Sequence, residues 1–94
     1  MGDESKTGIT LGAISNAQAK GYFEEHSAFR GSFTNAIAAR DDFGNCHGVV
    51  AFTADGGEFR KEHISTDGSA QIGSLLYGGM VRAAMALGYK TLTL

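Results

Sequence analysis

The residues whose types and spacing best suit chemistry lie in the last third of the chain, where a predicted strand runs into a predicted helix. The turn from Thr66 to Ala70 is built of small and polar residues. Such a turn aims several backbone N–H groups and the positive end of the helix dipole at one point, which suits a phosphate. The predicted anion-binding residues are Gly68, Ser69, Ala70, Gln71, Ile72, Gly73 and Ser74. The alternative is an ordinary strand-to-helix connection whose small residues allow tight packing.

Length, charge and cysteine content limit what the chain can be. Its 94 residues suffice for one domain, and 14 glycines with no proline indicate many tight turns. The formal charge of −2 and the lack of a basic run argue against stable binding to a nucleic acid. The single cysteine, Cys46, excludes an internal disulfide, and it lacks metal ligands nearby in the sequence apart from His47. A single cysteine suits a reducing compartment, and no run is long enough to span a membrane, so we expect a cytoplasmic protein. Because Cys46 and His47 have no further ligands nearby in the sequence, we expect no metal.

The first part of the chain predicts an arm, a strand and a helix. Residues 1–8 are polar and predict a flexible arm, and Ile9–Ile14 predicts a strand. Ser15, with a glutamine three residues on, forms a capping box that predicts a helix over Asn16–His26. This helix is expected to bury Ala19, Tyr22 and Phe23.

The second part predicts a meander, a helix and a final strand. The meander consists of three strand-like segments separated by turn formers, at 32–40, 46–53 and 58–65. The helix that follows carries apolar residues at a 3.6-residue period, at 72, 75, 76, 80, 83 and 87. Gly88 ends this helix, and 90–94 alternates like a strand that returns parallel to the last strand of the meander. The predicted fold class is α/β (α+β), with a mixed, mostly antiparallel sheet of about five strands and two main helices.

This order of elements resembles the first two-thirds of the GNAT acyltransferase superfamily, over residues 9–94. In that family a segment Arg/Gln-x-x-Gly-x-Gly/Ala between the fourth strand and the main helix binds the pyrophosphate of acyl-coenzyme A through backbone amides. The corresponding run here is Gly68-Ser-Ala-Gln-Ile-Gly73. It departs from the pattern at Gly68, where Arg or Gln would lead, and at Gln71, where the first glycine is expected. Since the family continues past its fifth strand, the resemblance implies a minimal GNAT-like domain, truncated after that strand.

A closer resemblance is to small phage and prophage GNAT-like proteins related to the Mom DNA-modification protein. Short motifs carry it, at Asn16-Ala17, Arg30-Gly31, Thr66-Asp-Gly68, Leu76-Tyr-Gly78 and Ala86-Leu-Gly-Tyr89. This resemblance implies a phage-encoded protein that acts in the cytoplasm of a host.

The resemblance also implies roles for residues outside the turn. The pantetheine arm of acetyl-CoA, or of another acyl-CoA, would lie along Ile64, Ser65 and Thr66, unless these groups simply pair within the sheet. Glu62 and His63 would be catalytic, removing a proton from the acceptor amine, with a solvated glutamate and a surface histidine as the simpler alternatives. His26 and Arg30 would bind an acidic or phosphate-bearing acceptor, although the helix dipole alone could account for His26. Asp67 could act in the site or cap the second helix.

Two functions from different classes remain open. The first is acyl-CoA-dependent N-acyltransferase activity, most simply acetyl transfer to an amine on a protein, a nucleobase or a small molecule. The second keeps the fold without the chemistry, as a catalytically inactive binding or inhibitory protein that acts on a host defence factor. Its exposed final strand would then pair with a partner or with a second copy of the chain.

Overall fold

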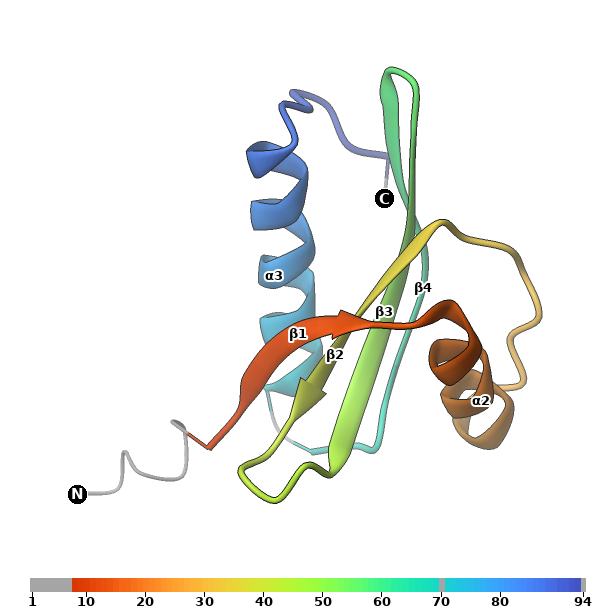
Figure 1. The fold of residues 1–94 in the computed structure, drawn as a ribbon, viewed down its shortest axis with the longest axis vertical. Helices are drawn as coiled ribbons and strands as arrows, with labels where there is room; N and C mark the ends of the chain where they lie inside the picture. The colour runs from red at the N-terminus through yellow and green to blue at the C-terminus, as the bar shows by residue number, and fades with distance from the viewer. Residues whose placement is uncertain (1–7, 70, 94) are drawn as a thin grey trace.

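The part of the chain that the structure describes folds into four strands and two helices. A computed structural model describes residues 8–69 and 71–93. The elements are β1 (Thr10–Ile14), α2 (Asn16–His26), β2 (Asn35–Arg40), β3 (Cys46–Asp55), β4 (Glu58–Thr66) and α3 (Ile72–Ala86) (Figure 1). The predicted fold class is confirmed, and α2 has the bounds that the capping box predicted. The arm predicted at residues 1–8 lies almost wholly outside the described residues.

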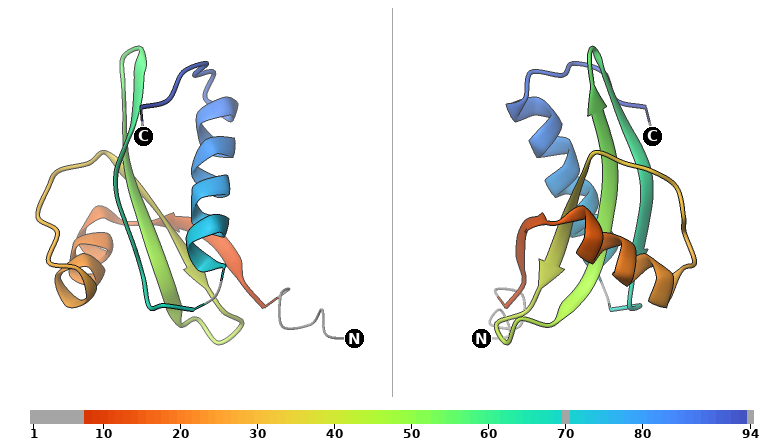
Figure 2. Two further views of the ribbon diagram at one scale, coloured as in Figure 1. Left: turned by 180° about the vertical axis from the view of Figure 1, so that it is seen from behind. Right: turned by 45° about the vertical axis from the view of Figure 1, so that its right-hand side comes forward.

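The sheet is antiparallel throughout its four strands, in the order β1-β2-β3-β4. The helices α2 and α3 cover opposite faces of it, as Figures 1 and 2 show from three directions. β2 begins at Asn35 rather than at 32, and β3 continues to Asp55, two residues beyond the predicted end. The segment 32–34 stays outside the ladder of β2, although the Thr34 amide bonds to the Phe52 carbonyl (3.1 Å).

The prediction of a fifth strand at 90–94 is wrong in its length, within the described residues. Its parallel direction relative to β4 is confirmed. Only Thr93 pairs with the sheet, in a parallel bridge to Arg60 of β4. The Lys61 amide donates to the Thr93 carbonyl, and the Thr93 amide donates to the Phe59 carbonyl, both at 2.9 Å. The residues before it cross from the end of α3 to the sheet, and the Tyr89 hydroxyl bonds to the Gly56 carbonyl on the way (3.1 Å). The crossing uses up most of the segment, so the strand shrinks to one bridge.

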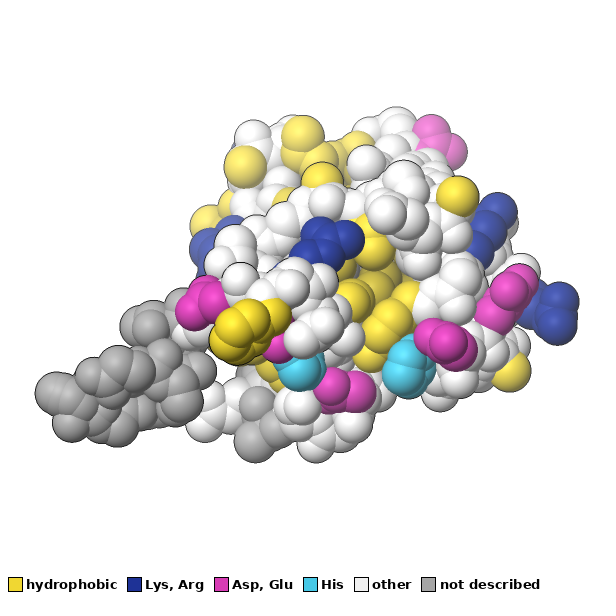
Figure 3. Space-filling model, turned by 60° about the horizontal axis from the view of Figure 1, so that its bottom comes forward, with side chains coloured by type: hydrophobic (Ala, Val, Ile, Leu, Met, Phe, Trp, Pro, Cys, Tyr) yellow, Lys and Arg dark blue, Asp and Glu magenta, His cyan; other side chains and the backbone are white. Residues whose placement is uncertain are grey.

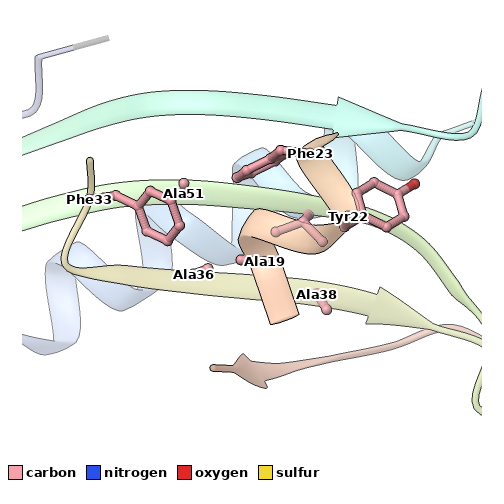
Figure 4. Packing of buried hydrophobic residues seen from close by; sticks show 8 residues of the cluster. Ala19, Tyr22, Phe23, Phe33, Ala36, Ala38 and Ala51 are labelled. Carbon is pink, nitrogen blue, oxygen red and sulfur yellow. The ribbon is translucent and has the colours of Figure 1, made fainter. Parts of the chain in front are cut away.

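The core beneath α2 is built from aromatic rings set against small strand residues. The three helix residues predicted to be buried, Ala19, Tyr22 and Phe23, are all buried. Figure 4 shows them between α2 and the strands β2 and β3, where alanines leave room for the rings. Ser15 accepts the Gln18 amide at 3.1 Å, as the capping box requires.

The core beneath α3 is mainly aliphatic and holds that helix close to the sheet. Its buried helix residues recur at every fourth position: Ile72, Leu76, Met80 and Ala84. Leu75 and Leu87, which fit the predicted period, are exposed instead, so the buried stripe is narrower than the apolar pattern. A side chain at Gly79 would collide with Leu11 of β1, at 2.8 Å. The helix therefore packs closely on β1 at this glycine, and a larger residue would require Leu11 to move.

Candidate functional site

A β-bulge in β4 determines where the predicted catalytic pair points. Ala51 lies opposite His63 and Phe52 lies opposite Lys61, so Glu62 is an extra residue in β4. Neighbouring strand residues normally point to opposite faces, and a bulge interrupts this alternation. Glu62 accepts a hydrogen bond from Thr53 and His63 contacts Phe23 of α2, which places both side chains on the α2 face. The structure therefore brings the two predicted catalytic residues together.

His63 is enclosed by groups that keep it neutral and fix its ring. Phe29 stacks on the imidazole with ring centroids 4.4 Å apart and planes 2° from parallel, and Phe23 meets it edge-on at 5.0 Å. Its Nε2 lies 2.9 Å from the Ser27 hydroxyl. Burial, and then the nearby Lys61 ammonium, lower the pKa of His63 below its ordinary value of 6.5. The imidazole is thus uncharged at neutral pH and can accept a proton.

Gly31 allows this stacking. A Cβ at Gly31 would collide with the ring of Phe29. The glycine of the Arg30-Gly31 motif therefore gives Phe29 its place against His63.

Glu62 is held by neighbours on the same face of the sheet. Its Oε2 accepts hydrogen bonds from the Thr53 hydroxyl (2.6 Å) and from the Arg60 guanidinium (3.2 Å). Arg60 also contacts Glu58 at 2.8 Å, and the two carboxylates raise the pKa of this arginine, Glu62 foremost. Both bonds to Glu62 end on one oxygen, and within the described part of the chain Oε1 bonds to no partner. The carboxylate is therefore oriented with one oxygen left to receive a proton or a ligand.

The outer edge of β4 is paired with Thr93 before the bulge and is left unpaired by the described residues after it. The Asp67 amide donates to the His47 carbonyl at 2.9 Å, which fixes the alternation of the β3–β4 ladder. By that alternation Ser65 directs its backbone groups toward β3, whereas Ile64 and Thr66 direct theirs outward. Of the described residues only Thr93 pairs with this edge, and it does so before the bulge. Of the three predicted pantetheine residues, Ile64 and Thr66 thus present backbone groups outward and Ser65 does not.

The turn predicted to bind an anion is partly occupied by its own side chains. The Gly68 amide bonds to the Thr66 hydroxyl (3.2 Å), and the Ser69 amide bonds to the Asp67 carboxylate (2.9 Å). The Ile72 amide points back to the Ser69 carbonyl at 3.5 Å. Ala70, also predicted to bind here, lies outside the described residues. These three amides are therefore engaged within the turn, and a bound phosphate would have to displace their present partners.

The start of α3 keeps two features that suit a ligand. Gln71 has a φ of 70°, a left-handed conformation that favours glycine, at the position where the GNAT pattern has its first glycine. A Cβ added at Gly73 would meet no described atom within 4 Å, so packing does not require glycine there. Ser74, in the same first turn of α3, is exposed. The space in front of this turn is open.

His26 and Arg30, the predicted acceptor-binding residues, are not brought together. His26 stacks on Tyr22 with ring centroids 4.1 Å apart, and its Nε2 lies 3.7 Å from Glu25. Arg30 instead lines a hollow of about 190 Å³ with Lys20, Glu24, Phe29 and Gly31. Phe29 also stacks on His63, so the hollow and the predicted base share this one residue.

A histidine that the sequence analysis set aside forms the tightest charged cluster. Nδ1 of His47 lies 2.7 Å from Asp67 and its Nε2 lies 2.9 Å from Asp41. Hydrogen bonds to Asp41 and then to Asp67 raise the pKa of His47 above 6.5. The pKa of Asp41 falls to about 2, chiefly through His47, and that of Asp67 falls to about 2, chiefly through Ser69. His47 therefore ties the β2–β3 turn to the turn before α3.

Asp67 does not cap α3. The residue at the N-cap position is Gln71, whose side chain makes no capping bond, and Asp67 serves the turn and His47 instead. Figure 3, which views this end of the molecule, shows histidine beside acidic side chains and shows Lys and Arg scattered over the face. Among residues 8–69 and 71–93, no group of three or more His, Cys, Asp and Glu side chains is arranged to hold a metal ion.

A groove on the α3 side of the sheet lies away from these residues. It has a volume of about 570 Å³ and runs between α3 and the strands β1 and β2. Its walls are mostly apolar, with one cation at the rim, and include Leu11, Ile37, Phe52, Gly79, Arg82 and Ala83. None of the predicted site residues lines it.

Comparison with known proteins finds no match to this chain among family models, curated proteins or solved structures. No helix in the described part of the chain is long and apolar enough to cross a bilayer. Function must therefore be inferred from the residues of this chain.

Proposed function

We propose that the chain binds an acyl-CoA, acetyl-CoA foremost, along the outer edge of β4 and transfers the acyl group to an amine. The observation that carries this proposal is the bulge at Glu62 together with the edge that follows it. Beyond the bulge, Ile64 and Thr66 direct backbone groups away from β3, and no described strand covers them. An extended ligand with amide groups, such as a pantetheine arm, can pair with such an edge as an added strand does. The sequence resemblance to GNAT acyltransferases supports the same placement.

The start of α3 would receive the diphosphate of the cofactor. The open space before Gly73 and the glycine-like backbone at Gln71 support this placement. The engaged amides of Gly68 and Ser69 oppose it in the present conformation. Binding therefore requires the Thr66 hydroxyl and the Asp67 carboxylate to give up these amides. We expect acyl-CoA binding to rearrange the turn from 67 to 71 while the helix and sheet stay in place.

The chemistry of acyl transfer calls for a base and for a place to hold the acceptor. The cofactor, when bound, supplies the acyl group as a thioester. An acceptor amine is protonated at neutral pH, and a neutral imidazole is a suitable base for it. His63 meets that requirement, and Glu62 lies beside it with one carboxylate oxygen unbonded by any described residue. Arg30 and Lys20 in the hollow lined by Phe29 suit an acceptor that carries an acidic group.

A thermal-unfolding titration with acetyl-CoA tests this proposal. A ligand at 100 times its dissociation constant stabilises a protein by about 2.7 kcal/mol. For a domain of this size, that corresponds to a rise in Tm of about 10 °C or more. We expect a saturable rise, and no rise at millimolar acetyl-CoA would contradict the proposal and favour the inactive binding protein.

Two glycine variants of the same helix make the test specific. Gly73→Leu should abolish the acetyl-CoA shift and leave the ligand-free protein folded, because a Cβ there meets no described atom within 4 Å. Gly78→Leu is the matched control, since a Cβ there meets only the flexible Arg82 guanidinium at 3.4 Å. Equal shifts in the two variants would show that acetyl-CoA binds elsewhere.

A further inference from the structure

The Ser27 hydroxyl lies within hydrogen-bond distance of a backbone carbonyl and of an imidazole. The Phe23 carbonyl at the end of α2 already accepts the Ser27 amide at 2.8 Å and the Ala28 amide at 2.7 Å. These two bonds match the two lone pairs of a carbonyl oxygen, so a third donor there is less favoured. The Ser27 hydroxyl lies 3.3 Å from that oxygen and 2.9 Å from Nε2 of His63. Because that carbonyl already holds two shorter amide bonds, the shorter contact to the imidazole is the favoured one for the hydroxyl proton.

The imidazole is prepared to take that proton. Phe29 and Phe23 pack against its ring from two directions, so its orientation is fixed. Burial lowers its pKa, which favours the neutral ring, and the neutral tautomer with its hydrogen on Nδ1 is the one that can accept the Ser27 proton at Nε2. Ser27 itself is exposed and lies in the loop directly after α2. A hydroxyl bonded to a neutral, oriented imidazole and open to solvent is the arrangement of a serine nucleophile and its base.

We propose that Ser27 and His63 form a nucleophile–base pair that takes an acyl group from an activated ester or thioester. The Ser27 oxygen attacks the acyl carbonyl carbon and its proton passes to Nε2 of His63. The carbon–sulfur or carbon–oxygen bond of the donor then breaks, and the imidazolium returns the proton to the leaving thiolate or alkoxide. Water or an amine attacks the Ser27 ester and frees the hydroxyl. This activity requires no cofactor site and goes beyond the proposed function.

A fluorophosphonate probe on the intact chain tests the pair without any acyl-CoA. The Ser27 oxygen would attack phosphorus, fluoride would leave, and the hydroxyl proton would pass through His63 to solvent. Mass spectrometry of the wild-type protein should find one phosphonate on the peptide that contains Ser27. The labelling rate should rise with pH through a pKa below 6.5 and then level off, which a structural serine would not show.

Three variants complete the test. Ser27→Ala should lose the label, and His63→Gln should label about a hundredfold more slowly or worse, the usual effect of removing a general base. Ser32→Ala, an exposed serine of the same loop, should label like the wild type. The inference is overturned by no labelling of the wild type, by a label mapped to another residue, or by an unchanged rate in a folded His63→Gln variant. Because the labelled residue is identified on the wild-type protein, the inference can be refuted even if a variant fails to fold.

Discussion

Two histidines on neighbouring strands of one sheet have pKa values shifted in opposite directions. His47 on β3 has a carboxylate on each ring nitrogen, at 2.7 and 2.9 Å. His63 on β4 has an aromatic ring on its face, another at its edge and a hydroxyl on Nε2. The first arrangement raises the pKa and the second lowers it. The partners of the imidazole, rather than its place on a strand, decide whether it is charged.

This difference in partners suggests a structural role for His47 and a chemical role for His63. His47 has both nitrogens committed and joins two turns, so it has no lone pair for a substrate. His63 is neutral, oriented and beside an exposed hydroxyl. A histidine with two carboxylate partners is therefore a poor candidate for a base, whereas one held by rings is a good one.

Removing the ring that stacks on His63 should give the largest effect. Phe29→Ala should lower the free energy of unfolding by about 2 kcal/mol, below the cost for a fully buried ring because Phe29 is only partly buried. It should also raise the pKa of His63 toward 6.5, because the imidazole regains water, and leave His47 unchanged. Histidine NMR titration and chemical denaturation measure the two effects. Gly31→Ala should shift the pKa in the same direction, since its Cβ displaces Phe29; an unmoved pKa in both variants would refute burial as the cause.

Removing the charge of the other histidine should change stability in a pH-dependent way. The pKa of His47 is raised in the folded protein, so its contribution is complete below 6.5 and is lost as pH rises through the folded pKa. The pKa values of Asp41 and Asp67 are lowered, so their contribution is complete above 3.8 and is lost as pH falls toward about 2. His47→Gln should therefore cost most between these limits. Chemical denaturation from pH 2 to 9 measures this, and a constant difference in stability between wild type and variant would refute an ionic contact of His47 with Asp41 and Asp67.

The smallest effect on the pKa of His63 should come from removing the nearby charge of Lys61. Lys61→Gln removes the cation that adds to burial in lowering the pKa of His63. We expect a slight rise of that pKa, smaller than in Phe29→Ala, with stability nearly unchanged. A shift larger than that of Phe29→Ala would mean that charge, rather than burial, dominates at His63.

Local signals in the sequence predicted the elements well. The capping box at Ser15 gave the start of α2, and the period of apolar residues with Gly88 located α3. The amide partners in the turn before α3 were also within reach of sequence reasoning, since Thr66 and Asp67 readily bond to amides two residues on. The single bridge at Thr93 was not, because it depends on how far the chain must travel from α3 to the sheet.

The site depends on contacts that sequence spacing does not reveal. The bulge at Glu62 has no glycine to mark it and follows from the register of β3 against β4. His47 and Asp67 are 20 residues apart, and Ser27 and His63 are 36 apart. Only the folded sheet and the loop after α2 bring these pairs together. The sequence could therefore propose Glu62 and His63, but it could not supply their neighbours.

Nitrogen-15 NMR of both imidazoles across the pH range tests the shared basis of the proposals most directly. We expect His63 to titrate below 6.5, with its hydrogen on Nδ1 when neutral, and His47 to titrate above 6.5. If His63 instead stayed protonated at neutral pH, or carried its hydrogen on Nε2, it could not take a proton from Ser27. Either result would contradict the account.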